Sequence, residues 1–226
     1  GVSALLLAAP GKRDTAFAPG ESRDRPPLDG RTRLALFLFA ASGFAAMVLE
    51  VGWTRGLALV LGSSVYAFAL MLLAFLSGLA AGSAAVSAWL RSRPRTDPGT
   101  LMAVLFGAAG VLSYATAFFF HSMPRIFAQV YFHGGVGPNA WLAVQFLFGF
   151  MVMFPATFAL GGGFPAALQL HARGLGRVGS SVGAVYSANT VGTIVGSAAA
   201  GFAVIPLLGV RNAILAVALC QVVLGA

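Results

Sequence analysis

Six long apolar stretches constrain the fold of this chain more than any other feature. They cover about residues 34–53, 65–90, 101–120, 140–160, 182–208 and 211–226. A helix needs about 20 apolar residues to cross the hydrocarbon core of a bilayer, and the first five stretches reach that length. The strict apolar–polar alternation of membrane β-strands is absent from them. The sequence therefore predicts an all-α integral membrane protein with about six transmembrane helices.

The composition excludes the soluble and nucleic-acid-binding classes. Hydrophobic residues make up 58% of the chain and charged residues only 9%, whereas a soluble domain carries about 25% charged residues. The net charge of +8 does not indicate a nucleic-acid surface, because the basic residues cluster at the ends of the apolar stretches. A single cysteine, Cys220, excludes a disulfide framework, and His121, His133 and His171 lack the spacing of metal ligands. We expect no metal site, and interfacial roles for the three histidines.

The two ends of the chain differ from the part between them. Residues 1–31 are rich in Pro, Gly, Arg and Asp, and we expect a polar, largely disordered arm there. Residues 32–226 form the predicted transmembrane domain. Its last stretch, about 16 residues long, is short for a crossing, which predicts a truncated sixth span.

The distribution of basic residues predicts an orientation. If the N-terminus is cytoplasmic, all of the 14 Lys and Arg residues except Arg55, Arg125 and Arg211 fall in the arm or in cytoplasmic loops. Membrane proteins concentrate Lys and Arg in their cytoplasmic loops. We therefore predict a multi-pass protein with both the N-terminus and the end of this sequence on the cytoplasmic side.

Glu50 is the only acidic residue inside an apolar stretch. The other five acids, Asp14, Glu21, Asp24, Asp29 and Asp97, lie in the arm or in a polar loop. A carboxylate at membrane depth costs several kcal/mol unless it is paired, protonated or hydrated, so Glu50 is a candidate for a functional site. The alternative is that Glu50 lies near the outer interface and pairs with Arg55 or Arg211 as a packing device.

Trp53 and Arg55 follow Glu50 closely and extend this candidate site. In the functional interpretation, Glu50 attracts an amine cation and Trp53 supplies a cation–π wall beside it. In the alternative, Trp53 is an aromatic anchor at the membrane interface.

A second polar group lies in the fifth stretch. Its members, spaced so that they share one helix face, are Tyr186, Asn189, Thr190 and Thr193. One hypothesis is that this face and Glu50 line a common polar cavity, to which Gln145 and Gln169 contribute from the fourth stretch. The other is that these side chains only form hydrogen bonds between helices.

Glycine patterns predict close helix packing and an internal repeat. Gly78 and Gly82 form one G-x-x-x-G pair, and Gly192 and Gly196 form another. A similar short sequence precedes each pair: GSSVYA at 62–67 and GSSVGA at 179–184. The second and fifth apolar stretches therefore resemble each other. The predicted orientation makes them run in opposite directions, which fits an inverted three-plus-three repeat, as in half of a major facilitator transporter. Chance similarity between two Gly/Ala/Ser-rich helices is the alternative.

Two further patterns predict interruptions of helices. LGGGFP at 160–165 has neither the lysine nor the acidic partner of a phosphate-binding loop, and we expect a helix break there with Pro165 starting a new helix. Residues 125–132, within a polar and glycine-rich connection, are expected to form a separate short interfacial helix.

About residues 34–226 resemble the N-terminal membrane domain of bacterial fused major-facilitator/spermidine synthase-like proteins. Two sequence motifs carry the resemblance most specifically. The first, E-x-x-W-T-R, is formed by Glu50, Trp53, Thr54 and Arg55, and the second, Y-x-x-N-T-x-G, by Tyr186, Asn189, Thr190 and Gly192. The resemblance implies location in the bacterial inner membrane. It also implies a cytoplasmic aminopropyltransferase-like domain that binds decarboxylated S-adenosylmethionine. That domain and its cofactor site are absent from this chain.

Three functions follow as hypotheses. In the first, the chain is the membrane domain of a spermidine synthase-like protein, which anchors or supplies a polyamine-type aminopropyl transfer. The second is a structural subunit of a larger membrane complex, and the third is a half-transporter for a small cationic solute, working as a homodimer. No acid–base pair, activated nucleophile or metal constellation is present in the sequence, so we predict no catalytic residue in it. The expected partners are the lipid bilayer and other membrane subunits or a second copy, not nucleic acid.

Overall fold

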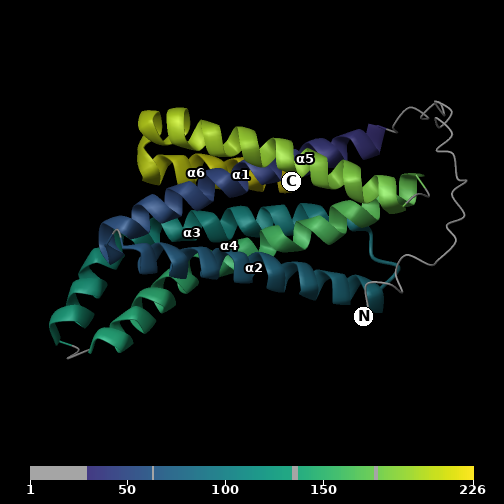
Figure 1. The fold of residues 1–226 in the computed structure, drawn as a ribbon. Coiled ribbons are helices and arrows are strands. Elements are labelled where there is room, and N and C mark those ends of the chain that lie inside the picture. Colours follow the sequence, from purple (N-terminus) through teal and green to yellow (C-terminus); the bar gives the residue numbers. More distant parts are fainter. Residues whose placement is uncertain (1–29, 63, 134–136, 176–177) are drawn as a thin grey trace, which may run out of the picture.

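The computed structural model is all-helical over the residues that it describes, 30–62, 64–133, 137–175 and 178–226. Its helices, in chain order, are α1 (Gly30–Leu61), α2 (Val65–Ser92), α3 (Pro98–His133), α4 (Pro138–Leu175), α5 (Val178–Ala199), the π-helical segment η2 (Ala200–Val204) and α6 (Ile205–Gly225). Consecutive helices run in opposite directions, so that α1, α3 and α5 point one way and α2, α4 and α6 the other (Figure 1).

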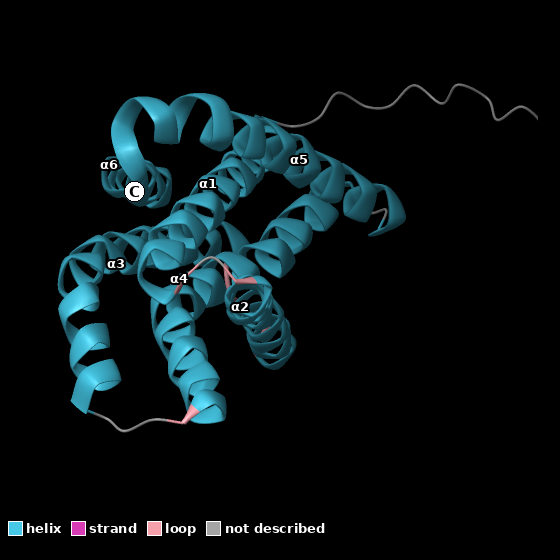
Figure 2. Cartoon of the chain, turned by 60° about the vertical axis from the view of Figure 1, so that its left-hand side comes forward, coloured by secondary structure: helices cyan, strands magenta, loops and turns pink. Residues whose placement is uncertain are grey.

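Five helical segments are long and apolar enough to cross a membrane. The last of them, Val182–Gly225, takes in α5, η2 and α6. After η2 the chain turns back, and α6 returns beside α1 and α3 (Figure 2). By helix length and composition the chain is a multi-pass membrane protein.

Local sequence explains where several helices begin and end. Helix α1 stops at Gly62, whose φ of 86° lies in the left-handed region that glycine tolerates. The hydroxyl of Ser64 accepts a hydrogen bond from the Ala67 amide at 3.1 Å and caps the start of α2. Asp97 does the same for α3, because its Oδ2 accepts from the Thr100 amide at 2.8 Å. These caps satisfy amide groups that the helix itself leaves unpaired.

Gly209 makes the bend in the last apolar segment, with φ 76° and ψ 163° inside α6. This conformation is essentially restricted to glycine, and other residues pay about 1–3 kcal/mol to adopt it. We therefore expect Gly209→Ala to lower the thermal unfolding midpoint in detergent by several degrees. Gly201→Ala is the matched control, because no atom lies within 4 Å of its added Cβ and its φ is not positive. Equal midpoints for the two variants would contradict this account of the bend.

Both predicted helix interruptions are wrong. Helix α4 continues through residues 160–165 with Pro155 and Pro165 inside it, and α3 continues past Pro124 to His133. Membrane helices tolerate proline where neighbouring helices stabilise them. The glycine run serves close packing instead: an added Cβ at Gly161 would meet the backbone of Leu79, and one at Gly162 would lie 2.6 Å from Val86 Cγ2.

The two G-x-x-x-G pairs lie where helix backbones touch. An added Cβ at Gly78 would collide with Thr157 Oγ1 and lie 3.0 Å from the Phe154 carbonyl oxygen, and one at Gly82 would collide with the Phe158 carbonyl. Helix α2 thus packs directly on α4.

On the other side of the bundle, α5 packs on α1 in the same manner. An added Cβ at Gly192 would collide with the Ala40 carbonyl, and one at Gly196 would lie 2.5 Å from the Phe44 carbonyl oxygen. Close backbone approach of this kind replaces the hydrophobic driving force that is missing between helices in lipid.

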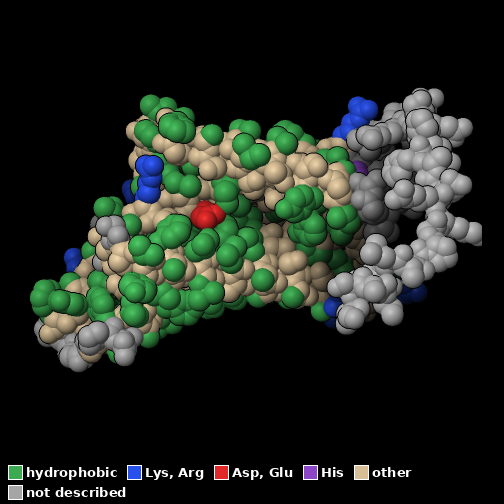
Figure 3. Space-filling view, in the orientation of Figure 1, with side chains coloured by type: hydrophobic (Ala, Val, Ile, Leu, Met, Phe, Trp, Pro, Cys, Tyr) green, Lys and Arg blue, Asp and Glu red, His purple; other side chains and the backbone are tan. Residues whose placement is uncertain are grey.

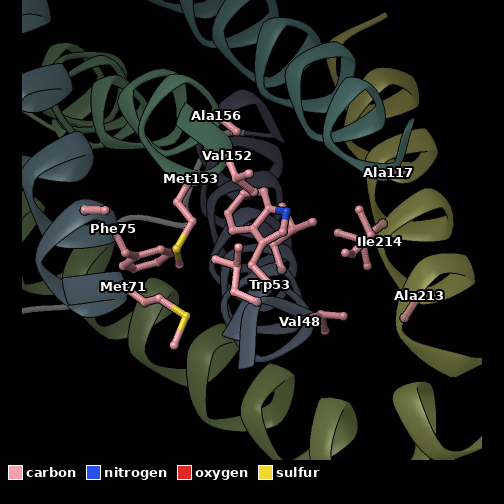
Figure 4. Close-up of a cluster of buried hydrophobic side chains, with 14 of the residues drawn as sticks. Val48, Trp53, Met71, Phe75, Ala117, Val152, Met153, Ala156, Ala213 and Ile214 are labelled. Atoms are coloured by element: carbon pink, nitrogen blue, oxygen red, sulfur yellow. The ribbon is translucent and has the colours of Figure 1, made fainter. Parts of the chain in front are cut away.

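The main core lies between these helix pairs and surrounds Trp53. Its buried side chains come from five helices and include Val48, Met71, Phe75, Val152, Met153 and Ile214 (Figure 4). The indole of Trp53 lies among them with no exposed surface. This cluster holds α1 at the centre of the bundle.

Candidate functional site

Glu50 lies on α1, half-buried, well inside the apolar segment Arg33–Leu59. Of the two acids that the structure describes, it is the one away from the ends of the bundle. Figure 3 shows one acidic spot on this face, away from the ends of the bundle and with apolar side chains next to it. In the described part of the chain Glu50 forms no ion pair with Arg55 or Arg211. Neither arginine therefore compensates the charge of its carboxylate.

Helix α1, which carries Glu50, runs parallel to α5, with Ala40 against Gly192 and Phe44 against Gly196. It also contacts the π-helical turn η2 that follows α5. Short π-helical segments occur frequently at functional sites.

Trp53 lies in the core and belongs to neither predicted role. Its side chain is 0% exposed. The indole Nε1 donates a hydrogen bond to Thr116 Oγ1 at 3.0 Å, and the Thr116 hydroxyl donates to the Ser113 carbonyl at 2.6 Å. Because no face of the ring is open, Trp53 is neither an interfacial anchor nor a cation–π wall for a ligand at Glu50. Arg55, two residues further on, is exposed.

The polar face of α5 packs on α1 before Glu50. Asn189 lies at Gly43, where an added Cβ would lie 2.6 Å from the amide oxygen of Asn189. Seven residues separate Gly43 from Glu50, which is about 10 Å along a helix. Tyr186 is exposed, and the Thr190 hydroxyl donates to the Tyr186 carbonyl at 2.8 Å. A common polar cavity of this face and Glu50 stays a prediction.

The two glutamines of α4 differ in their surroundings. Gln145 Nε2 donates to the Leu61 carbonyl at 2.9 Å and so pairs one of the free carbonyls at the end of α1. Gln169 Oε1 is buried and has no hydrogen-bond partner among the described residues. A contribution of either side chain to a cavity at Glu50 stays a prediction.

Two buried polar side chains were not predicted as buried. His171, the last residue of the apolar segment Ala140–His171, is 1% exposed, and neither ring nitrogen has a partner in the described part of the chain. Gln221 on α6 is equally buried, and both ends of its amide are unpartnered there. For Gln221 the sequence offered a signal, its position inside an apolar stretch, since polar residues at membrane depth are rare.

Comparison of this chain with protein-family models, with curated proteins and with solved structures finds no match. In the described ranges, no three His, Cys, Asp or Glu side chains gather in a group that could hold a metal ion. A functional assignment therefore rests on the residues of the chain itself, and above all on Glu50.

Proposed function

We propose that the chain is a six-crossing membrane domain built as an inverted repeat of α1–α3 and α4–α6, and that it binds an organic amine at Glu50. The glycine contacts support the repeat. One shift along the sequence takes Gly78 and Gly82 of α2 to Gly192 and Gly196 of α5. The same shift takes Ala40 and Phe44, which Gly192 and Gly196 contact, to Phe154 and Phe158, which Gly78 and Gly82 contact. The contact of α2 with α4 is thereby the counterpart of the contact of α5 with α1.

The third helix of each half gives a matching pair of contacts, at a shift one residue longer than that of the glycine pairs. An added Cβ at Gly110 of α3 would lie 2.6 Å from the Ala218 carbonyl oxygen of α6, with the backbone of Val222 also in contact. In return, an added Cβ at Gly225 of α6 would lie 2.5 Å from both the Ala103 carbonyl oxygen and the Gly107 amide of α3. If α1–α3 is superposed on α4–α6 and the reverse, the contact of Gly110 with Ala218 falls on the contact of Gly225 with Ala103. A pseudo-two-fold axis between the halves requires this correspondence. Since α1 and α4 run in opposite directions, that axis lies across the helices.

The observation that carries the function is the isolated acid. Glu50 is half-buried in an apolar segment and has no cationic partner among the described side chains. A carboxylate in such a place is stabilised by a counter-charge, and an ammonium group supplies both charge and hydrogen-bond donors. The apolar side chains around it suit the methylene segments of an alkylamine.

An amine site agrees with the spermidine synthase-like resemblance. In that interpretation the domain lies in a bacterial inner membrane with its N-terminus in the cytoplasm, and it presents a polyamine-type substrate to an aminopropyltransferase-like domain outside this chain. Decarboxylated S-adenosylmethionine would bind to that domain. A half-transporter for a small cation is the second candidate, because inverted repeats are typical of secondary transporters.

The amine site is tested by titrating spermidine into the purified chain in nanodiscs and measuring the heat of binding. We expect Glu50→Gln to weaken binding at least tenfold, since it removes a charge-assisted hydrogen bond of about 1.5–3 kcal/mol. Glu50→Asp keeps the charge and should restore part of the affinity. Asp97→Asn is the control, because it removes a carboxylate at the start of α3, away from Glu50, and keeps a side-chain oxygen for the helix cap.

Full spermidine affinity in Glu50→Gln would refute the site. Uptake of spermidine into sealed proteoliposomes by the wild type, abolished in Glu50→Gln, would favour the transporter over the anchoring domain. Binding without uptake would favour the anchoring domain.

A further inference from the structure

One end of the bundle carries an apolar groove lined by aromatic side chains. The end of α3 and the start of α4 run together away from the other helices, towards the lower left of Figure 1. The groove has a volume of about 440 Å³. Its walls come from α1, α3 and α4 and consist of Leu59, Pro124, Phe127, Ala128, Tyr131, Phe132 and Trp141.

The aromatic rings of the groove pack against one another and give it a firm wall. The centroid of Trp141 lies 4.5 Å from that of Phe127 and 5.0 Å from that of Tyr131. Other side chains at the groove remain open to the surroundings: Leu59 is 85% exposed and Phe132 is 76% exposed. In a membrane-spanning bundle such apolar surface faces hydrocarbon rather than water, so the acyl chain of a lipid suits this groove.

The groove lies at the ends of the apolar segments of three helices. The segment of α1 ends at Leu59, that of α3 ends at Phe120 and that of α4 begins at Ala140. Leu59 and Trp141 therefore belong to the ends of two segments, and the α3 residues of the groove follow the end of the third. Trp and Tyr side chains at such ends commonly meet lipid headgroups, so an occupant reaches from the hydrocarbon core to the headgroups.

Two arginines flank the groove and have no acidic partner. Arg55 lies one turn before Leu59 on the same face of α1, and Arg125 shares a face of α3 with Ala128 and Phe132. Both are exposed, and neither forms an ion pair in the described part of the chain. No acidic residue follows Asp97 in the sequence, and Asp97 lies about 40 Å from Arg125 along α3. Glu50 precedes Arg55 by five residues on α1 and forms no ion pair with it, so both guanidinium groups stay unpaired among the described residues.

We propose that this groove binds an anionic phospholipid, with an acyl chain against the aromatic wall and the phosphate between Arg55 and Arg125. Guanidinium groups bind phosphate oxygens through paired N–H donors, which matches the two arginines. The apolar groove next to them requires the rest of the ligand to be hydrocarbon, which free phosphate cannot supply. The site is independent of the amine site at Glu50.

The proposal is tested by native mass spectrometry of the full chain in detergent. Dioleoyl phosphatidylglycerol and dioleoyl phosphatidylcholine are titrated separately, and the unfolding midpoint is followed with each lipid. We expect the wild type to bind phosphatidylglycerol more tightly, and the double variant Arg55→Gln/Arg125→Gln to lose about tenfold of that affinity. Ala128→Trp, which fills the groove and keeps both arginines, should lose phosphatidylglycerol binding as well.

Arg91→Gln is the matched control, because Arg91 is an equally exposed arginine at the other end of the bundle, in the last turn of α2. Unchanged phosphatidylglycerol binding in the double arginine variant or in Ala128→Trp would overturn the proposal. An equal loss in Arg91→Gln would also overturn it, since the effect would then be general charge. Inorganic phosphate at millimolar concentration should leave the midpoint unchanged; stabilisation equal to that by phosphatidylglycerol would rule out a lipid site.

Discussion

Gly82→Ala and Gly192→Ala are each expected to destabilise the bundle by about 2–3 kcal/mol, because one methyl group would separate two helices in contact. At Gly82 the new Cβ would occupy the place of the Phe158 carbonyl on α4, and at Gly192 that of the Ala40 carbonyl on α1. Backbone atoms cannot turn aside as a side chain can. The whole helix must shift, and its contacts with the core weaken along its length.

The expected loss corresponds to a fall of roughly 5–10 °C in the unfolding midpoint, measured in detergent by tryptophan fluorescence. Gly183→Ala is the matched control: it lies on α5 like Gly192, and no atom lies within 4 Å of its added Cβ. Alanine at that position should leave stability equal or slightly higher, since it favours helix more than glycine does.

The two glycine variants also test the inverted repeat. If the halves are equivalent, Gly82→Ala and Gly192→Ala should have similar effects, because their contacts are counterparts of one another. A large loss in one and none in the other would argue against equivalent halves. A wild-type midpoint in both would contradict the close backbone contact itself.

Trp53→Ala is expected to be the most damaging single substitution in the core, with a loss of about 3–5 kcal/mol. The indole is fully buried among side chains of several helices, so its removal leaves a large cavity next to Val152 and Ile214. It also removes the hydrogen bond from Nε1 to Thr116 Oγ1, which joins α1 to α3.

The hydrogen bond can be separated from the packing by a second pair of variants. Trp53→Phe keeps most of the ring but removes the donor, and Thr116→Val removes the acceptor and leaves the indole N–H buried without a partner, at a cost of about 1–3 kcal/mol. Trp89→Ala is the control, because Trp89 is 37% exposed at the end of α2. If Trp53→Ala and Trp89→Ala unfold at the same temperature, the central role of Trp53 is wrong.

The candidate site was only partly predictable from the sequence. Glu50 stands out there because an acid inside an apolar stretch is rare, and the structure describes it as half-buried without an ion pair. The surroundings of Trp53 were not predictable, because they depend on how α1 is rotated about its axis. The turn of α1 that carries Glu50 directs Trp53 into the core, away from a ligand at Glu50.

The groove near Arg55 and Arg125 was also only partly predictable from the sequence. The sequence marks both arginines among the three exceptions to the cytoplasmic cluster, but they are 70 positions apart in the numbering of the chain. The tertiary structure places Leu59 of α1, one turn after Arg55, in one groove with Ala128 and Phe132 of α3, which share a helix face with Arg125.

The sequence by itself determined the class of this protein: apolar stretches of bilayer length admit only helices, since every backbone polar group must then be paired within its own segment. Tertiary structure decided which helices touch, that the glycine run of α4 stays helical, and that Trp53 and His171 are buried. The physical reason is the solvent. In lipid, outward-facing and inward-facing residues are both apolar, so the sequence of a membrane helix carries little information about which face turns inward. That face is chosen by small residues and shape, through contacts with a partner helix that lies far away along the chain.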